Sequence, residues 1–392
     1  MKPHTLTIFA LLIWWTAISQ VPTVYIIDAG RVVELKKKVD LRDGRTMALV
    51  SQLIHQADSL VGIRPMSVID KALVPVSGNK HDYMSQAPYF WYDSTKPNGL
   101  PYFRRDGVRN PEIYKITDRT YLGQLENASS KLALAWYLSG NEKYAAKAAL
   151  LLRTWFLDEA TRMNPHLEYG QAIPGVNTGR GIGIIETIAL TNIADAAGIL
   201  TGSNSWTQND HAALQKWYGS YLDWLITSQH GKDERRAKNN HGTWYYAQAI
   251  DFALFTGDKA KAKQLVEESL ARLDSQLNSD GQQPLELERT TALGYSTMNL
   301  KGWFIVARLA EKTGIDLWNF KTSKGATLTS AVEWLLPYAI GEKSWPYQQI
   351  NKYNPSEIYP LLLQLKANEK YNVYMQTLKQ ANKDVMTALI WE

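Results

Sequence analysis

Apolar residues recur every three or four positions along most of this chain, which is the spacing that lines up one face of an α-helix. Val50, Leu53, Ala57 and Leu60 form one such stripe, and the strict apolar–polar alternation of a strand is scarce. Further stripes run through residues 125–136, 143–157, 184–200, 210–227, 243–256, 259–277, 297–312, 326–339 and 370–381. The pattern predicts an all-α fold.

Short turns with a central glycine separate several of these stripes. Gly140, Gly202, Gly257 and Gly314 stand in such turns, 62, 55 and 57 residues apart. Glycine suits the left-handed residue that closes a helix, and each interval has room for two helices with their loops. Because one helical hairpin cannot bury its apolar face alone, we expect roughly six or seven hairpins to stack into an incomplete or closed (α/α) toroid. The toroid is predicted to be a single domain over residues 20–392.

Two long stretches interrupt the helical pattern. Residues 74–112 are rich in Pro, Gly, Tyr and Asp without a helical period, and residues 161–181 also lack one. Loops of this length in a compact protein are usually functional or disordered. Their density of Tyr, Trp and Arg argues against disorder. We therefore expect both stretches to be active-site loops carried by the helical scaffold.

The N-terminus has the features of an export signal. A short polar head precedes the apolar run Leu6–Ile18, about 13 residues long, which is too short to cross a bilayer comfortably. Ala17 and Ser19 supply small residues for cleavage after Ser19. We predict a signal peptide over residues 1–19, with a buried N-terminal helix as the alternative. The chain has no Cys, so we expect a periplasmic or secreted bacterial protein, without membrane insertion once the signal is removed.

The charge balance and the aromatic content suggest the kind of partner. The formal net charge is +5, and the chain has 14 Trp and 21 Tyr. No dense Lys/Arg tract or nucleic-acid-binding motif is present, so nucleic acid is not predicted as a partner. An acidic polysaccharide fits better, because a basic cleft attracts it and aromatic faces stack on sugar rings. The seven His show no ligand spacing, so no metal and no cofactor are predicted, and the oligomeric state stays open.

One polar cluster that could carry chemistry stands at the start of an apolar helical stretch. Here Asn239, Asn240 and His241 follow one another. Either Asn is also suited to cap a helix, and a single His is more often structural than catalytic. A helix N-terminus nevertheless offers backbone N–H groups and positive potential to an anion.

A second polar cluster contains Arg289 and Tyr295, six residues apart. In one continuous helix these side chains would lie on different faces, but an irregular stretch at Gly294 would bring both into one cleft. The alternative is an Arg paired with Glu286 or Glu288 and a Tyr in the core.

Together the two clusters supply the groups that β-elimination on a uronate requires. The C5 proton becomes removable once the adjacent carboxylate is neutralised, which Arg and Asn side chains can do. A base must then take that proton, and an acid must protonate the leaving O4. In mannuronate and glucuronate both leave from the same side, so one Tyr can serve as base and acid. In guluronate they leave from opposite sides, which suits His as base and Tyr as acid.

At these motifs the sequence resembles the alginate lyase superfamily of helical-toroid polysaccharide lyases, over most of the chain from about Val21 to about Tyr347. The segments that carry the resemblance are 77–85 (SGNKHDYMS), 87–91 (APYFW), 99–102 (GLPY), 104–107 (RRDG), Asn164-Pro165, Gln171, Asn239-Asn240-His241, 286–289 (ELER) and Tyr295. The run Gly242-Thr243-Trp244 departs from the Ser and aromatic residue that follow the His in the best-known members. The 74–112 loop looks more like a branch that includes glucuronan-cleaving enzymes.

The resemblance implies that Asn240 and Arg289 neutralise the substrate carboxylate. It implies His241 as base or carboxylate partner, and Tyr295 as acid or as both acid and base. Further candidates for substrate contact are, from the first loop, Tyr92, Lys96, Arg104 and Arg105; from an early helix, Asn127, with a buried polar cap as alternative; from the second loop, Asn177, Arg180 and Glu186; and, as stacking platforms or core residues, Trp244 and Tyr245.

The sequence thus predicts a metal-independent lyase that cleaves 1,4-linked uronic-acid polymers, above all alginate and polymannuronate, with glucuronan as the alternative substrate. Two rival functions are a glycoside hydrolase and a non-catalytic polysaccharide-binding protein. A hydrolase needs two carboxylates across the glycosidic bond, for which Asp106, Glu186, Glu286 and Glu288 are available. A binding protein has no need for His241 and Tyr295 together.

Overall fold

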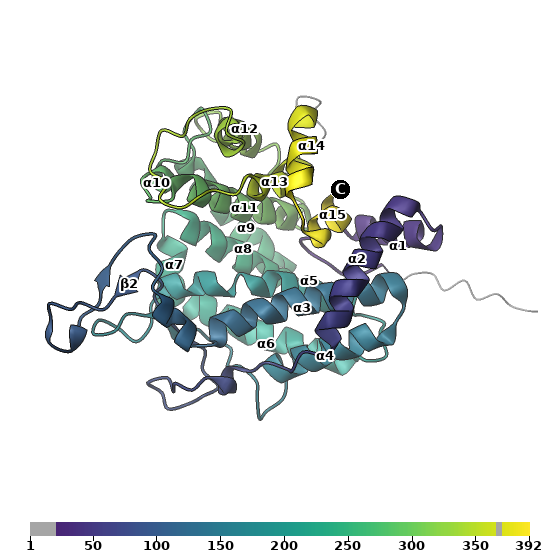
Figure 1. Ribbon diagram of the computed structural model, residues 1–392, viewed down its shortest axis with the longest axis horizontal. Helices are drawn as coiled ribbons and strands as arrows, with labels where there is room; N and C mark the ends of the chain where they lie inside the picture. The colour runs from purple at the N-terminus through teal and green to yellow at the C-terminus, as the bar shows by residue number, and fades with distance from the viewer. Residues whose placement is uncertain (1–20, 366–370) are drawn as a thin grey trace, which may run out of the picture.

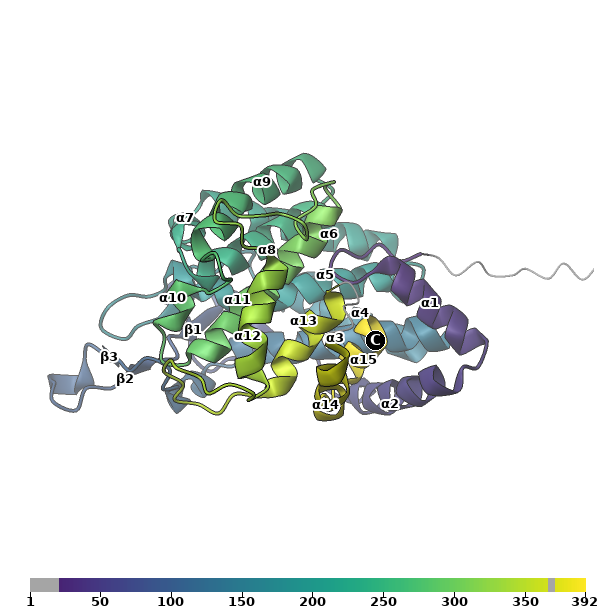
Figure 2. The ribbon, with the colours of Figure 1, turned by 90° about the horizontal axis from the view of Figure 1, so that it is seen from above.

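The computed structural model describes residues 21–365 and 371–392, so the predicted signal peptide lies outside the described part of the chain. Helices make up most of the molecule (Figures 1 and 2). They are α1 (Ala29–Asp40), α2 (Gly44–Val61), α3 (Asp118–Ser139), α4 (Glu142–Phe156), α5 (Ala189–Ile199), α6 (Gln208–Thr227), α7 (Gln229–Arg236), α8 (Asn240–Phe255), α9 (Lys259–Gln276), α10 (Pro284–Leu287), α11 (Ala292–Glu311), α12 (Leu328–Ala339), α13 (Tyr359–Gln364), α14 (Asn372–Ala381) and α15 (Val385–Trp391).

The helices pack in sequence-adjacent pairs around a central helix, as an (α/α) toroid. Helices α3 and α4 form one pair and α8 and α9 another, while α8 also packs against α5, α6, α7 and α11. Every residue of α8 except His241 is buried. A helix that is apolar on all sides belongs inside a bundle, and its sequence from Trp244 to Phe255 fits that place. The predicted all-α toroid is therefore confirmed.

The glycine turns have the predicted left-handed backbone. The φ angles are 69° at Gly140, 95° at Gly202, 86° at Gly257 and 82° at Gly314. A residue with a Cβ is strained in this region, whereas glycine adopts it freely. At Gly140 the left-handed residue caps α3, and its N–H donates to the Trp136 carbonyl.

The two predicted loops meet in a small sheet. Strand β1 (Met84–Gln86) pairs in parallel with β4 (Tyr169–Ala172), with Met84 opposite Tyr169. Strands β2 (Phe90–Trp91) and β3 (Phe103–Arg104) form an antiparallel hairpin that projects from the body of the toroid (Figures 1 and 2). This hairpin and its flanking residues, 87–110, are hereafter called the arm. The pairing of β1 with β4 joins the root of the arm to the second loop.

A buried ion pair fixes the root of the arm to the start of α3. Lys71 is fully buried, and its Nζ lies 3.0 Å from Oδ2 of Asp118. The same ammonium donates to the carbonyls of Val68 and Lys80, and Asp118 accepts the Met84 N–H at 2.9 Å. These contacts bind the Lys71 ammonium and the Oδ2 atom of Asp118, so the chain entering β1 is held against α3.

One segment of the described chain, Gly181–Ile199, is apolar and long enough to cross a membrane by length and composition. It covers the 3-10 helix η4 (Gly181–Thr187) and α5. Inside the protein 72% of this segment is buried, which is the environment of a core helix.

The segment before α1 is fastened to α5 by Asp195. The buried Asp195 carboxylate accepts three successive backbone N–H groups, those of residues 25–27, at 2.6, 3.1 and 2.8 Å. One turn later Gly198 brings α5 against the same segment, because a Cβ there would lie 1.8 Å from the Thr23 carbonyl oxygen. The N-terminal segment is thus part of the folded core.

We expect Asp195→Ala to lower the free energy of unfolding by about 3 kcal/mol, because it leaves one buried and two part-buried N–H donors without an acceptor. Urea unfolding followed by circular dichroism measures this change. Asp43→Ala is the matched control, since Asp43 is an exposed cap that accepts only from Thr46 and should cost about 1 kcal/mol. Equal losses in the two variants would contradict the anchoring role of Asp195.

Candidate active site

A cleft of about 430 Å³ opens at the end of the toroid where α7, α10 and the arm gather (Figures 1 and 2). Its walls come from the arm, the segment around η4, the junction of α7 with α8, and the start of α11. The lining residues are Pro88, Tyr89, Phe90, Arg104, Arg109, Arg119, Gln171, Arg180, Ile182, Ile185, Ala237, Asn239, Asn240, His241, Arg289, Tyr295 and Met298.

His241 stands in the first turn of α8 and is held by a buried carboxylate. Its Nδ1 lies 2.7 Å from Oε1 of Glu234 on α7, and the Glu234 side chain is 1% exposed. Since an ionised carboxylate only accepts, this contact assigns the ring hydrogen to Nδ1. The lone pair of Nε2 is then available to take a proton.

Gly242, next to His241, allows a close approach of other groups to the start of α8. A Cβ at this position would meet the Ala237 carbonyl oxygen and the Arg272 guanidinium. Arg272 donates to the carbonyls of Ala237 and Arg235, which closes the turn between α7 and α8. The close approach explains why this chain has glycine after the histidine.

Asn240 is bound at two points by Glu286, a buried residue of α10. The Asn240 backbone N–H donates to Oε1 at 2.6 Å, and its Nδ2 donates to Oε2 at 2.7 Å. Burial raises the pKa of Glu286, while the hydrogen bonds from Asn240 lower it. One N–H of Nδ2 remains for a ligand in the cleft, because Glu286 takes the other.

Arg289 lies in the link between α10 and α11 and packs on Tyr295 in the first turn of α11. Its Cζ is 3.9 Å from the centroid of the Tyr295 ring, and its Nη2 is 3.1 Å from Oδ1 of Asp106 in the arm. The break in the helix therefore falls at residues 288–291 and not at Gly294, which is helical. The expected meeting of Arg289 with Tyr295 is confirmed, but its cause is a different irregular stretch.

The hydroxyl of Tyr295 contacts a second tyrosine. Tyr89 of the arm places its OH 2.9 Å from the Tyr295 OH. Burial is the largest cause that raises the pKa of Tyr295 above its ordinary value, and the neighbouring Tyr89 is the second. The phenol of Tyr295 therefore holds its proton at neutral pH and can pass it only to a strongly basic group such as an alkoxide.

The charge of the lining has one sign. Arg104, Arg109, Arg119, Arg180 and Arg289 line the cleft, and no Asp or Glu stands among its lining residues in the described chain. Such a surface attracts an anion and binds its carboxylates.

Carboxylates that do not line the cleft hold three of its five arginines. Asp106 binds both Arg289 and Arg104. Burial raises the pKa of Asp106, but the hydrogen bond and the charge of Arg289 outweigh burial and hold this pKa below its ordinary value. Glu186 is buried, accepts from Tyr83 and Ser85, and lies 3.6 Å from Arg119. The acidic groups therefore orient the basic ones.

Two of the predicted loop residues line the cleft, and two others support it. Arg104 and Arg180 are lining residues, and Arg180 donates to the side chain of Gln171 at 2.8 Å. Arg105 stacks over the Trp91 ring at 4.9 Å and does not line the cleft. Glu186 positions Arg119 without lining the cleft itself.

The expectation that Trp244 and Tyr245 stack on sugar rings is wrong. Trp244 is 5% exposed and Tyr245 is fully buried. Both belong to α8, which is surrounded by other helices, so neither ring presents a face to the cleft.

The other predicted contacts lie away from the cleft. Tyr92 packs over Gly99 and the edge of Tyr102 in the arm, and Lys96 precedes the 3-10 helix at the arm's tip, Pro97–Gly99. Asn177 accepts the Ile173 N–H within the second loop. Asn127 lines a separate cavity, between α3 and α15. Each of these four expectations is corrected by the placement of the side chain.

Glu234, Tyr89, Arg109 and Arg119 belong to the site but were not predicted from the sequence. Glu234 stands in the charged run 232–236, which has the composition of a solvated helix face. This one carboxylate is buried by the packing of α7 against η4, α8 and α6. Tyr89 lies within the 87–91 motif that carries part of the family resemblance, and this motif was the sequence signal that could have identified it as a site residue.

The carboxylates considered for a hydrolase are not arranged as a hydrolytic pair. Asp106, Glu186 and Glu286 are each bound to protein groups, and Glu288 is exposed. None of them lines the cleft. An acid and a base across a glycosidic bond are required for hydrolysis, and this site lacks that pair among its lining residues.

Comparison with known proteins identifies the family. The family model described as alginate lyase matches residues 67–345. The crystal structure of an alginate lyase from Bacteroides ovatus has 38% sequence identity and a TM-score of 0.88, over 95% of this chain and 100% of that chain.

Two further structures share the fold at lower identity. Alginate lyase A1-III from Sphingomonas species A1 has 14% identity and a TM-score of 0.52, over 82% of this chain and 88% of that chain. A histidine-to-alanine variant of A1-III complexed with a tetrasaccharide has 15% identity and a TM-score of 0.57, over 96% of this chain and 97% of that chain. A search of curated proteins gave no significant match. The family match over most of the chain and the 38% identity show that this protein belongs to the alginate lyase family and is a polysaccharide lyase.

Proposed function

We propose that this polysaccharide lyase cleaves alginate by β-elimination without a metal ion. The observation that carries the proposal is the meeting of Asn240, His241, Arg289 and Tyr295 in one cleft. The lining of this cleft has five arginines and no carboxylate. A tetrasaccharide occupies the A1-III variant structure. We propose that an acidic oligosaccharide binds this cleft too, and that the protein acts in the periplasm or outside the cell.

Neutralisation of the sugar carboxylate is the first step of the proposed mechanism. Arg289 and the free N–H of Asn240 Nδ2 donate to the carboxylate of the unit that loses its C5 proton. These donors stabilise the enolate-like charge that develops there. Asp106 and Glu286 hold the two donors in place before substrate arrives, so little reorganisation is needed during the reaction.

The proton transfers follow from the hydrogen bonds of His241 and Tyr295. Nε2 of His241 takes the C5 proton, and the electron pair forms the C4=C5 double bond as the C4–O4 bond breaks. Tyr295 donates its proton to O4 of the leaving chain. This division suits guluronate, where the two groups leave from opposite sides. On mannuronate Tyr295 acts as base and then as acid, which requires that it first lose its own proton. The Arg289 charge over its ring favours this loss and opposes the effect of burial. The phenolate then takes the C5 proton and passes it to O4.

On polyguluronate we expect Tyr295→Phe and His241→Ala each to reduce kcat by about 10³-fold, because each removes a proton-transfer group. Polymer affinity should stay within a few-fold of the wild type, since the arginines remain. Initial rates from the absorbance of the unsaturated product, and equilibrium binding to alginate, measure the two effects. Near wild-type cleavage by both variants would rule out the assigned roles.

Glu234→Gln tests the positioning of His241. A glutamine can donate to Nδ1 and so stabilise the wrong tautomer, and we expect kcat to fall by roughly 10²-fold with little change in KM. Asp233→Asn is the matched control, because Asp233 is the exposed neighbour paired with Arg236. A change in KM alone, or equal effects of the two substitutions, would show that Glu234 does not orient the base.

The substrate proposal is tested with polymannuronate, polyguluronate and glucuronan, each with and without a chelator. We expect unsaturated products from the alginate blocks, with polymannuronate cleaved fastest, and rates independent of the chelator because side chains supply all the proton transfers. Mass spectrometry separates elimination products from hydrolysis products, which carry an added water. Faster cleavage of glucuronan than of the alginate blocks would show that glucuronan, and not alginate, is the preferred substrate. Saturated products would show hydrolysis and would overturn the proposed β-elimination.

A further inference from the structure

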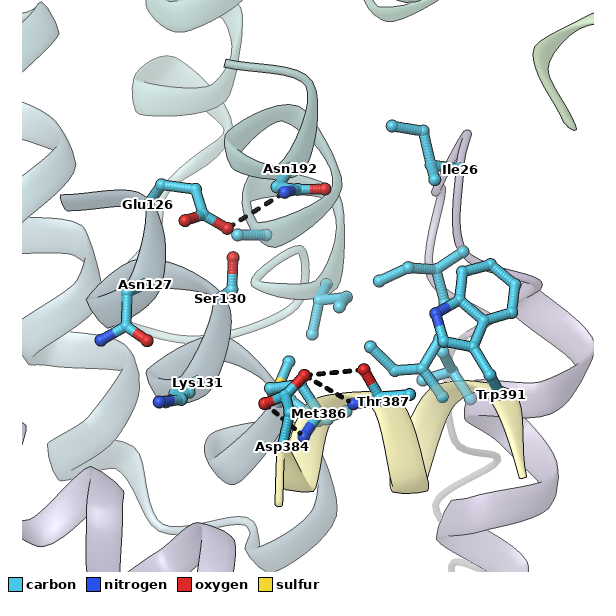
Figure 3. A pocket seen from close by; sticks show the side chains of 16 residues that line it. Ile26, Glu126, Asn127, Ser130, Lys131, Asn192, Asp384, Met386, Thr387 and Trp391 are labelled. Carbon is cyan, nitrogen blue, oxygen red and sulfur yellow. Dashed lines mark hydrogen bonds between the residues drawn. The ribbon is translucent and has the colours of Figure 1, made fainter. Parts of the chain in front are cut away.

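A second cavity, of about 340 Å³, lies near the C-terminal half of α3 (Figure 3). It is enclosed by the segment before α1, by α1, α3 and α5, and by the C-terminal helix α15. Arg119, in the first turn of α3, lines the active-site cleft, whereas Glu126 and Leu134 of the same helix line this cavity. The two sites share no lining residue, so this cavity is separate from the lyase site.

One side of the cavity is apolar. Its wall includes Ile26, Val32, Leu134, Ile199 and Ile390, all of them buried. Trp391 and Met386 of α15 continue this surface, and Figure 3 shows the Trp391 indole next to the apolar side chains. A hydrocarbon group placed here would leave water for an apolar surface.

The opposite side is polar and centred on Glu126. One Glu126 oxygen accepts from Nδ2 of Asn192 at 3.0 Å, and Figure 3 shows the carboxylate and the Ser130 hydroxyl directed toward the same space. The Ser130 oxygen is buried and has no hydrogen-bond partner among the described residues. A buried polar atom without a partner is costly, and a ligand with a donor group would satisfy it.

The charge of this cavity is opposite to that of the active-site cleft. Its lining has two carboxylates, Glu126 and Asp384, and one ammonium, Lys131. Burial raises the pKa of Glu126, and the charge of Asp384 adds to this effect, while Asn192 and Lys131 oppose it. Two carboxylates and one ammonium give the lining a net negative charge, which favours a bound cation over an anionic uronate.

We propose that this cavity binds a small amphipathic cation, a protonated primary amine on a hydrocarbon body. The ammonium lies by Glu126, within reach of the Ser130 hydroxyl and in the field of Asp384. The hydrocarbon body packs on the apolar wall and on the Trp391 indole. The combination of an apolar wall with a few convergent polar groups is the usual form of a small-molecule site.

Three probes with the same hydrocarbon body test the head-group preference: hexylammonium, hexanol and hexanoate. Isothermal titration calorimetry of the full-length protein should give hexylammonium a dissociation constant on the order of millimolar, as such a small ligand allows. Hexanol should bind at least about tenfold more weakly and hexanoate not measurably. Absence of hexylammonium binding at ten times that concentration, or equal binding of hexanoate, would overturn the proposal.

Matched variants locate the binding. Glu126→Gln keeps the shape and the Asn192 contact but removes the charge, and should weaken hexylammonium binding about tenfold. Asp384→Asn keeps a good cap for α15 and should weaken hexylammonium binding by a smaller factor than Glu126→Gln does. Glu267→Gln, at an exposed position of α9, should have no effect. Unchanged binding by Glu126→Gln, with its cleavage of alginate and its melting temperature equal to the wild type, would place the amine elsewhere and refute the site.

Discussion

The active site depends on two buried carboxylates that hold the first turn of α8. Glu286 accepts the backbone and side-chain N–H groups of Asn240, and Glu234 accepts from His241. Because α8 is enclosed by other helices, its first-turn N–H groups must find partners within the protein. The hydrogen bond from the Asn240 backbone N–H to Glu286 satisfies the start of the helix, and the same carboxylate fixes the Asn240 amide. The side-chain contact with Glu234 fixes the His241 imidazole, which lines the same cleft.

Charge is arranged in two layers around the cleft. Arginines face the cavity, and the carboxylates that bind them, Asp106 and Glu186, lie behind. An exposed pair of acids would repel a uronate chain and would resemble the arrangement of a hydrolase. With the acids withdrawn, the cleft presents five arginines and no carboxylate to the sugar carboxylates. The separate cavity near α15 has the opposite balance, because Glu126 and Asp384 outnumber Lys131 there.

The arm completes a site that the toroid alone would leave open. It supplies Asp106 to Arg289, 183 residues away in sequence, and Tyr89 to Tyr295, 206 residues away. Pairing of β1 with β4 and the buried Lys71–Asp118 ion pair fix the arm's root. The reacting tyrosine is consequently held from two sides, by a guanidinium over its ring and by a second phenol at its hydroxyl.

The sequence by itself determined the toroid, its glycine caps and the four residues that meet in the cleft, because helical periodicity, turn chemistry and motifs are local properties of the chain. It did not determine which carboxylate holds His241, since Glu234 stands in a charged run and is buried only when α7 packs against η4 and α8. It also suggested sugar contacts for Trp244 and Tyr245, which the surrounding helices enclose, and for Asn127, which faces another cavity. Burial and the partners of a charge depend on elements far apart in sequence, so only the tertiary structure decided them.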